Sequence, residues 1–452
     1  MNIIIVGAGE VGRYLAERLS VQSVHNICVI EKSESRCAVL SEKLDVRVMT
    51  ADGTSVMVLE EANIARCDLF LAVSSDQSTN LVAASLAKSL GASTTIARVH
   101  ASMLQEEWLF DFKKQFNINH IFSSERLVAV ELAKFIRSPD ALFVQELAKG
   151  QIELQQLIVS SSSPYVGKAL AEIALPPHIL IGMVKRARRV HIPDGSFTIQ
   201  EDDLITLLGP PNKLKSLRNK FQTDVKDSNG ASSVVIFGGN EYGATLASIS
   251  QAAGIDTRIF EPDEKLCSAL SHSLPEVTIL NGDATQLEPL REECVGKADF
   301  FVAVTPNDED NVMACLQARN LGTPHCLVLI HRGDYAQIIQ DSRASLGLTG
   351  AVSPREATCQ DLMRFVTEDQ YHLVRKLDGG VELIEVIVRE KSQIAGKTVS
   401  EVRFPSGLIL VAQLRAQRAQ VPAASDVIEV GDTIYAIVSQ TAKKPFFKLL
   451  DG

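Results

Sequence analysis

Three glycines with a characteristic spacing stand near the start of the chain, in the segment Gly7-Ala8-Gly9-Glu10-Val11-Gly12. The first glycine of such a segment permits a tight turn, the second lets the backbone approach a pyrophosphate, and the third lets helix and strand pack closely. Free N–H groups at the start of the following helix then face the phosphates. The segment therefore predicts a nucleotide-binding loop. The alternative is a glycine turn that packs a strand on a helix and binds nothing.

Polar side chains after the next predicted strands extend this interpretation. Glu31 ends the second strand, where a carboxylate accepts hydrogen bonds from ribose hydroxyls and repels a 2′-phosphate, which favours NAD or an adenine nucleotide over NADP. Asp52 follows the third strand, where it would bond an adenine amine or a ribose, or serve as a helix cap or turn residue. Ser74 follows the fourth strand as a ligand contact or a cap, and Arg98 ends the fifth, where it would meet a phosphate.

A second loop of the same kind begins at Gly238 and reads Gly238-Gly239-Asn240-Glu241-Tyr242-Gly243. Asn240 replaces the middle glycine, and its side chain occupies space that a pyrophosphate would need. Glu261, Asp283 and Thr305 stand where Glu31, Asp52 and Ser74 stand after the first loop, whereas Leu329 replaces Arg98. Binding at the second loop is therefore left open.

The two loops belong to an internal repeat that spans the chain. Gly243 and Asp283 follow Gly12 and Asp52 by the same number of residues as Gly238 follows Gly7, and the register persists to His100 and His331. A polar, turn-rich segment at residues 223–230 joins the copies. Two copies, each about half of the chain, are the interpretation that this spacing favours.

The first part of each copy alternates short β-branched runs with helical patterns, which indicates a doubly wound parallel sheet. The last part is smaller and rich in strands. We expect an α/β protein with two tandem Rossmann-like domains, each followed by a small α+β domain. Helices are expected at 11–19, 36–44, 80–90, 124–136, 168–173 and 354–366. Strands are expected at 3–6, 27–30, 46–50, 69–73, 95–99, 121–122, 152–159, 178–185, 204–208, 383–388, 407–413 and 433–438. The predicted boundaries are 1–140, 141–222, a linker at 223–231, 232–370 and 371–452.

Composition excludes several classes of function. Of 452 residues 46% are hydrophobic, and the formal net charge is −10, which argues against nucleic acid as the main partner. No apolar run reaches the length of a membrane span, and no signal peptide is expected. Eight cysteines lie in apolar patterns without metal-ligand spacing, as buried thiols in a reducing cytosol do.

Residues for catalysis are hard to find. His100 and His331 recur just after the fifth strands, but a repeated histidine is more often a packing or turn feature than a single active site. The sequence has no G-x-S-x-G, H-E-x-x-H or G-x-x-x-x-G-K-[ST] motif. The dense basic run at 185–189 is expected to be a solvated hairpin edge, or a surface for an acidic partner. We predict no catalytic residues and no metal site.

The order and duplication of these motifs resemble the tandem-RCK TrkA proteins of bacterial Trk potassium-uptake systems. The resemblance rests on MNIIIVGAGEVGRYLAERL, on DLFLAVSSDQSTNLVAASLAKSLGA with its twin ADFFVAVTPNDEDNVMACLQARNLGT, on TIARV, and on the small-domain segment PPHILIGMVKRARRVHIPDGSFTIQEDDLITLLG. It covers essentially the full length. It implies that the small domains are RCK C-terminal domains.

The resemblance also implies a function. Such proteins are cytoplasmic regulators, peripheral to the inner face of the membrane, that assemble as homotetrameric rings and gate a potassium-conducting membrane subunit of the Trk type. They bind NAD or NADH and adenine nucleotides such as ATP or ADP. The ligand positions that it implies are Gly7, Ala8, Gly9, Glu10, Val11, Gly12, Glu31, Asp52, Val73, Ser74 and Arg98 in the first copy, and Gly238, Gly239, Asn240, Glu241, Glu261, Asp283 and Thr305 in the second.

Two other functions stay open at this point. One is an NAD-dependent oxidoreductase, although duplication of the loop without a separate substrate domain disfavours it. The other is a stand-alone nucleotide sensor that acts on a different transporter.

Overall fold

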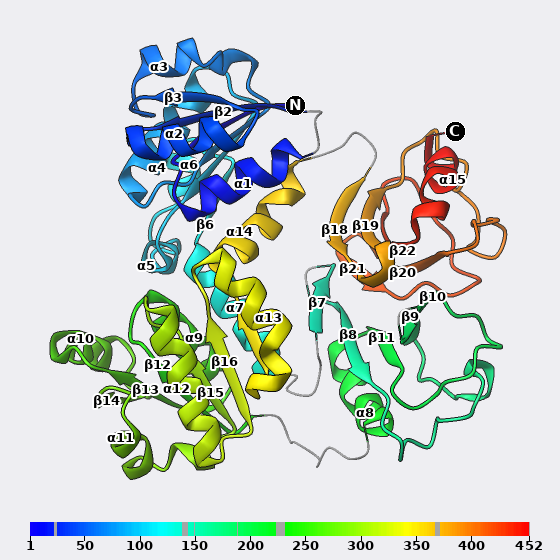
Figure 1. Cartoon of the computed structure of the whole chain (residues 1–452). Coiled ribbons are helices and arrows are strands. Elements are labelled where there is room, and N and C mark those ends of the chain that lie inside the picture. The colour runs from blue at the N-terminus through cyan, green and yellow to red at the C-terminus, as the bar shows by residue number, and fades with distance from the viewer. Residues whose placement is uncertain are drawn as a thin grey trace. The chain divides into compact units, whose positions relative to one another are not determined.

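A computed structural model describes residues 1–21, 25–137, 143–148, 150–187, 189–222, 231–366 and 371–451 (Figure 1). The predicted linker at 223–231 lies outside these residues except for Ala231, and so do parts of the predicted boundaries near 140 and 370. The chain divides into two compact units, each assembled from both copies. Unit 1 comprises Met1–Ile136 and Ala231–Val366, and unit 2 comprises Arg137–Gly230 and Thr367–Gly452.

Unit 1 contains two Rossmann-like lobes, which we call lobe 1 (Met1–Ile136) and lobe 2 (Ala231–Val366). Each lobe alternates strands and helices along the chain. The strands of lobe 1 are β1 (Asn2–Val6), β2 (Asn26–Glu31), β3 (Arg47–Thr50), β4 (Leu69–Ala72), β5 (Thr94–Arg98) and β6 (His120–Phe122). Its helices are α1 (Glu10–Ser20), α2 (Glu34–Lys43), α3 (Val56–Glu61), η1 (Ile64–Arg66), α4 (Gln77–Ser89), α5 (Ala101–Gln105), α6 (Phe112–Gln115) and α7 (Ser124–Arg137).

Lobe 2 repeats this order. Its strands are β12 (Ser233–Phe237), β13 (Asp256–Glu261), β14 (Thr278–Asn281), β15 (Phe300–Ala303), β16 (His325–Leu329) and β17 (Gly350–Val352). Its helices are α9 (Glu241–Ala252), α10 (Glu264–Ser273), α11 (Leu287–Glu292), η3 (Val295–Lys297), α12 (Asp308–Leu321), α13 (Gly333–Leu346), α14 (Pro354–Leu362) and η4 (Met363–Phe365).

Both sheets of unit 1 are parallel and share one topology. The strand order is β3-β2-β1-β4-β5-β6 in lobe 1 and β14-β13-β12-β15-β16-β17 in lobe 2. In this doubly wound order, the second and third strands are added on one side of the first strand and the next three on its other side. Ligands of such folds bind where the order switches. Strand β1 is buried on both faces, as a central parallel strand must be. The predicted fold class is confirmed.

The two lobes exchange their last helices. Val128, Leu132 and Ile136 of α7 belong to the hydrophobic core of lobe 2, beside Val234 and Leu246. In return, Cys359 and Leu362 of α14 pack into the core of lobe 1. Figure 1 shows α7 and α14 between the two sheets of unit 1. The exchange also places the first turn of α14, with Pro354 and Arg355, at a cavity of lobe 1.

Unit 2 contains the two small domains, each an antiparallel five-stranded sheet with one C-terminal helix. The strand orders are β10-β9-β11-β8-β7 and β18-β19-β22-β20-β21. The elements of the first are β7 (Phe143–Leu147), β8 (Ile152–Ile158), η2 (Leu170–Glu172), β9 (Leu180–Arg186), β10 (Arg189–His191), β11 (Leu204–Gly209) and α8 (Pro211–Phe221). Those of the second are β18 (His372–Lys376), η5 (Asp378–Gly380), β19 (Glu382–Ile387), β20 (Leu408–Arg415), β21 (Arg418–Gln420), β22 (Thr433–Val438) and α15 (Gln440–Asp451).

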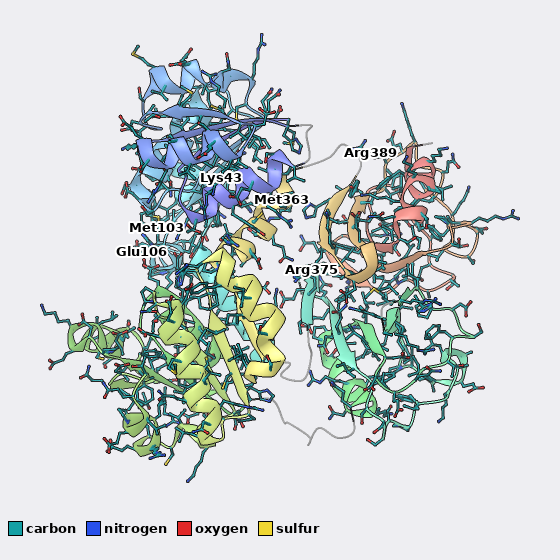
Figure 2. All side chains as sticks on the ribbon, viewed as in Figure 1. Lys43, Met103, Glu106, Met363, Arg375 and Arg389 are labelled. Atoms are coloured by element: carbon teal, nitrogen blue, oxygen red, sulfur yellow. The ribbon has the colours of Figure 1, made fainter. Side chains whose placement is uncertain are left out.

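The two small domains share a core. Met183 and Leu208 of the first domain pack with Val411 and Ile437 of the second. Each small domain also has a hydrophobic core of its own. Figure 2 shows the side chains on the ribbon of both units.

Several predicted elements were wrong in detail. The helix expected at 168–173 is only the three-residue turn η2, because the N–H groups of Leu170 and Ala171 donate to Phe197 and Gly195 instead of to the preceding turn. The helix expected at 354–366 ends as α14 at Leu362 and continues as η4. Strands β7, β10, β18 and β21 and helices α8 and α15 had no counterpart among the predicted elements.

Candidate nucleotide site

A cavity of about 420 Å³ lies at the carboxyl ends of β1, β2 and β4 in lobe 1. Its size falls within the range of small-molecule sites. Most of its walls come from lobe 1, and the rest come from lobe 2. The lining residues of lobe 1 are Val6, Gly7, Gly9, Glu10, Val11, Ile30, Glu31, Lys32, Arg36, Ala51, Gly53, Val73, Ser74, Ser75, Asp76, Thr79, Arg98 and Ser124, and those of lobe 2 are Tyr242, His331, Pro354 and Arg355.

The glycine loop has the geometry that its spacing predicts. Gly7 has a φ of +99°, and a Cβ atom there would lie 2.8 Å from the backbone of Ser74. A Cβ atom at Gly12 would collide with the carbonyl oxygen of Gly7, so this glycine brings α1 onto β1. A Cβ atom at Gly9 would meet no atom of the described residues within 4 Å, and Gly9 lines the cavity. Open space therefore remains where a pyrophosphate would approach.

Among the described residues, no side chain caps the start of α1. Gly9 occupies the capping position and has no side chain with which to accept hydrogen bonds from the first N–H groups of the helix. Those groups bear the positive end of the helix dipole. Glu10 and Val11 in the first turn line the cavity, so an anion bound there would meet free donors.

Glu31 binds the loop and also lines the cavity. Its Oε2 atom accepts a hydrogen bond of 2.6 Å from the N–H of Ala8, and its Oε1 atom accepts one of 2.9 Å from Ser33. Burial by itself would raise the pKa of Glu31, but these backbone hydrogen bonds outweigh it and lower the pKa. The carboxylate is therefore ionised at neutral pH, and each oxygen keeps a lone pair for a ribose hydroxyl.

The ends of β4 and β5 contribute Val73, Ser74 and Arg98 to the cavity wall. Asn80, which is fully buried, fixes these two ends by accepting from the N–H of Ser74 and donating to the carbonyl groups of Ser74 and Arg98. Arg98 forms an ion pair of 2.9 Å with Glu125, so its predicted phosphate contact competes with an existing partner. Asn80 is part of the repeat, yet its positioning role was not predicted.

Asp52 has the turn geometry that the sequence left as an alternative. Its Oδ1 atom accepts from both the N–H and the hydroxyl of Thr54, and its Oδ2 atom lies 3.1 Å from Lys32. Its neighbours Ala51 and Gly53, rather than its carboxylate, line the cavity. A ligand would reach Asp52 only beside Lys32.

Lobe 2 supplies a wall that the sequence did not predict. Its residues Tyr242, His331, Pro354 and Arg355 are more than 200 residues from the loop that they face. Tyr242 belongs to the second loop and His331 to the repeat, but neither pattern predicts a contact with the first loop. His331 Nδ1 lies 3.0 Å from the buried Asp308. Burial raises the pKa of Tyr242 to about 12, so this phenol stays neutral. The one available signal was the repeat itself, which aligns Arg355 with Glu125.

The second loop differs from the first at its centre. Asn240 has an extended backbone, and its Oδ1 atom accepts from the N–H groups of Tyr242 at 3.0 Å and Gly243 at 3.2 Å. Its Nδ2 atom donates to the carbonyl of Val304. The side chain thus occupies the donors that remain free at the start of α1.

The other predicted residues of the second site are also engaged with protein groups. The Glu261 carboxylate accepts from Gly239 and Asp263, Asp283 accepts from Thr285, and Thr305 bonds to Asn311. The N–H of Gly238 donates to Phe260. These residues keep the arrangement of lobe 1, whereas the helix start does not.

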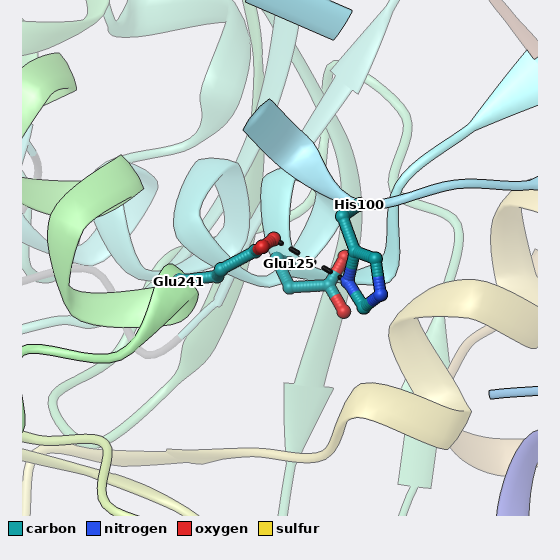
Figure 3. A group of neighbouring side chains, drawn as sticks. All are labelled: His100, Glu125 and Glu241. Carbon is teal, nitrogen blue, oxygen red and sulfur yellow. Dashed lines mark ion pairs between the residues drawn. The ribbon is translucent and has the colours of Figure 1, made fainter. Parts of the chain in front are cut away.

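Glu241 faces lobe 1, where it meets a histidine and a second glutamate (Figure 3). The ligand atoms of His100, Glu125 and Glu241 lie within 4.8 Å of one another. Glu241 accepts from the N–H of Ala101, and its carboxylate lies 3.6 Å from His100. Glu125 accepts from Ser123 and pairs with Arg98. Because both carboxylates already have donors, we interpret this cluster as a contact between the lobes.

Comparison with known proteins agrees with this architecture. Residues 3–121 and 234–354 match the TrkA-N domain, and residues 154–222 and 383–450 match the TrkA-C domain. The Trk system potassium uptake protein TrkA of Haemophilus influenzae is 30% identical over 464 residues, covering 98% of this chain and 97% of that protein. A TrkA homolog of Archaeoglobus fulgidus is 29% identical and covers 96% of both chains.

Solved structures show the same fold. The GsuK RCK domain superposes with a TM-score of 0.60 at 18% identity and covers 99% of this chain and 94% of its own. The GsuK channel bound to NAD gives 0.62 at 18% identity, covering 99% of this chain and 78% of that one. Within the described ranges, no helix is long and apolar enough to cross a membrane. The duplicated TrkA-N and TrkA-C domains, together with the full-length similarity, show that the chain belongs to the TrkA family of Trk potassium-uptake proteins.

Proposed function

We propose that this chain is a nucleotide-sensing regulatory subunit of a Trk-type potassium-uptake system. In this proposal it binds NAD, NADH or an adenine nucleotide such as ATP or ADP in the lobe 1 cavity. Bound ligand then changes the gating of a potassium-conducting membrane subunit. Family membership and the names of the full-length relatives support the transport role. The relatives do not name the ligand, so that part of the proposal depends on the site.

One observation carries the ligand assignment. The uncapped start of α1 opens onto a cavity beside Gly9, and Glu31 lines the same cavity. Helix donors suit a phosphate, and an ionised carboxylate about one strand away suits a ribose. A nucleotide or dinucleotide combines both groups at this spacing. The GsuK channel has been solved with NAD and with ADP, in a fold of the same kind.

The regulatory part of the proposal places the chain in the cytoplasm at the inner face of the membrane. Four chains would form a homotetrameric ring from their Rossmann-like domains. The domains of each chain would have the boundaries that the sequence predicts. A ligand shifts a two-state ring only by its difference in affinity for the two states, typically about 1–3 kcal/mol per coupled site. Several sites in one ring would add to a usable switch. Ion selection would belong to the membrane partner.

Calorimetric titration tests the ligand assignment. NAD, NADH, ADP and ATP are titrated into the wild-type chain and into Gly9→Val and Glu31→Ala. We expect micromolar binding of at least one ligand by the wild type. Gly9→Val should abolish binding because the new side chain enters the cavity. Glu31→Ala should weaken binding about tenfold because it removes the carboxylate. Unchanged affinity in both variants would reject the first-site assignment.

Flux measurements test the transport role. The chain is reconstituted with a Trk-type membrane subunit in vesicles, and potassium uptake is followed with and without the ligand that binds. A change in uptake that Gly9→Val removes is the expected result. Failure of the chain to associate with such a subunit would favour a stand-alone sensor of another transporter.

An oxidoreductase is the second candidate, because His331, which pairs with Asp308, lines the cavity. A paired histidine is a common proton donor or acceptor beside a nicotinamide. Incubation with NAD and a panel of hydroxy acids decides between the two. Robust NADH formation that is lost in His331→Gln would replace the regulatory proposal with an enzymatic one.

A further inference from the structure

We infer that Arg355 of lobe 2 binds the phosphate groups of the ligand that the loop of lobe 1 holds. This inference rests on the proposed function and identifies what the site selects. It would make the cavity one composite site, with the cradle on one lobe and a charge-sensing side chain on the other.

The pairing of the basic side chains around the cavity singles out Arg355. Lys32 lies 3.1 Å from Asp52, Arg36 lies 3.8 Å from Glu31, and Arg98 lies 2.9 Å from Glu125. For Arg355, by contrast, no ion pair with a carboxylate is found among the described residues. Its Nε atom is buried, and no hydrogen-bond partner for it is found in the part of the chain that the structure describes. A buried donor without an acceptor costs free energy, and a bound anion would recover that cost.

Packing holds the guanidinium in place. It lies over the ring of Tyr14, 4.6 Å from the ring centroid, on the same helix α1 whose first turn lines the cavity. The guanidinium also lies against Gly333, where even a Cβ atom would collide with it. The planar fork of an arginine suits a phosphate, and a fork already ordered by packing loses less entropy on binding.

The exchange of helices explains how this side chain reaches lobe 1. Arg355 lies in the first turn of α14, which packs into the core of lobe 1 through Cys359 and Leu362. In the repeat, Arg355 takes the place of Glu125 in the first turn of α7. The two copies therefore carry opposite charges at matching positions. Glu125 meets Arg98, whereas Arg355 faces the loop that lacks a cap.

A ligand bound in this way would connect the two lobes. The loop of lobe 1 would hold the pyrophosphate from one side and Arg355 would hold it from the other. Only a ligand with phosphate charge would be held by both lobes in this way. Such a ligand would bind more tightly to the state in which Arg355 faces the loop than to other states, and a switch requires this difference in affinity. The expected ligand class is a diphosphate-bearing adenine nucleotide or dinucleotide, in preference to a nucleoside.

Titration of ligands that differ in phosphate charge tests the inference. ADP, NAD, AMP and adenosine are titrated into the full-length wild type and into Arg355→Gln, Arg355→Lys and Gly333→Ala. The matched control is Arg332→Gln, which removes a guanidinium that pairs with Glu309 outside the cavity. Thermal midpoints of all variants confirm that each one is folded.

We expect Arg355→Gln to weaken ADP and NAD by at least tenfold, AMP by less, and adenosine by no more than twofold. Lysine should recover part of the loss because it restores the charge without the fork. Gly333→Ala should reproduce the loss because the new methyl group displaces the guanidinium. Arg332→Gln should bind as the wild type does.

Two results would overturn the inference. One is wild-type affinity of Arg355→Gln for ADP and NAD, and the other is an equal loss for all four ligands, which would indicate a structural role. If adenosine binds too weakly to measure, AMP serves as the reference of low charge. Absence of nucleotide binding in the wild type is a different failure, because it rejects the proposed function itself.

Discussion

The Oδ1 atom of Asn240 lies 3.0 Å from the backbone nitrogen of Tyr242, so lobe 2 caps its own helix where lobe 1 leaves the helix start free. The two loops otherwise match closely. A single side chain therefore separates an open phosphate cradle from one that the protein fills itself. This difference makes the two lobes unequal partners and leads to the first prediction.

Placing asparagine at position 9 should give lobe 1 the capped helix start that Asn240 gives lobe 2. In Gly9→Asn the new side chain should cap α1 as Asn240 caps α9, and nucleotide affinity should fall at least tenfold. Stability should change by no more than a few tenths of a kcal/mol, because asparagine and glycine are both good capping residues. Calorimetry gives the affinity and thermal unfolding gives the stability. Asn240→Gly is the matched control, since it should leave binding at lobe 1 intact. Full affinity in Gly9→Asn would contradict the proposed cradle.

Glu31 should set the preference between dinucleotides. Its carboxylate is ionised because backbone hydrogen bonds lower its pKa, and it would repel a 2′-phosphate. We expect the wild type to bind NAD at least tenfold more tightly than NADP. In Glu31→Ser the ratio should approach one. Equal affinities for NAD and NADP in the wild type would show that Glu31 serves only the loop.

Mirrored ion pairs should stabilise unit 2. Asp432 accepts from Arg415 and from the N–H of Glu429, and Asp203 accepts from Arg186 and from the N–H of Gln200. Replacing either buried aspartate with asparagine should cost about 2 kcal/mol. For a unit of this size that loss lowers the midpoint by roughly 4–8 °C. Scanning calorimetry measures the shift in midpoint. The control is Glu390→Gln, which should show no shift because Glu390 is exposed. Arg186 belongs to the basic run at 185–189, so part of that run is structural.

The contribution of Asp432 should depend on pH. Burial would raise its pKa, but hydrogen bonds from Arg415 and Glu429 outweigh burial and lower the pKa. The folded state therefore takes up its proton at lower pH than the unfolded state does. The stability that Asp432 contributes is fully present above about pH 5 and declines as the pH falls through the folded pKa. The difference in midpoint between the wild type and Asp432→Asn should shrink from pH 7 to pH 3. A constant difference would exclude this linkage.

An exposed apolar patch between α5 and α6 should take part in self-assembly. Trp108 is 85% exposed and Leu109 is 72% exposed, and Phe110 adjoins them. Contiguous patches of this kind commonly mark interfaces. Trp108→Glu combined with Leu109→Glu should shift the assembly toward smaller species in sedimentation experiments. Met57→Glu is the control, because Met57 on α3 is 83% exposed but lies outside the patch. An unchanged assembly would place the interface elsewhere.

The sequence alone determined the fold class and the first loop. Short apolar runs and helical patterns reflect which side chains a doubly wound parallel sheet and its helices must bury, and these patterns are local. The glycine spacing is likewise a local rule, since Gly7 and Gly12 meet atoms of the same strand-turn-helix segment and its neighbouring strand. The constant spacing between matching residues predicted two copies of one fold, because copies of a fold keep their register. Asn240 likewise distinguishes the second loop from the first by residue type alone.

Tertiary structure decided the rest. The exchange of α7 and α14 between the lobes brings Arg355 to a loop that lies more than 300 residues earlier in the chain, and no pattern in either segment encodes that contact. The roles of Asp52 and Arg98 depended on Thr54, Lys32 and Glu125, which compete with a ligand for the same groups. Local spacing fixes which groups are available, whereas the packing of distant segments fixes which of them remain free.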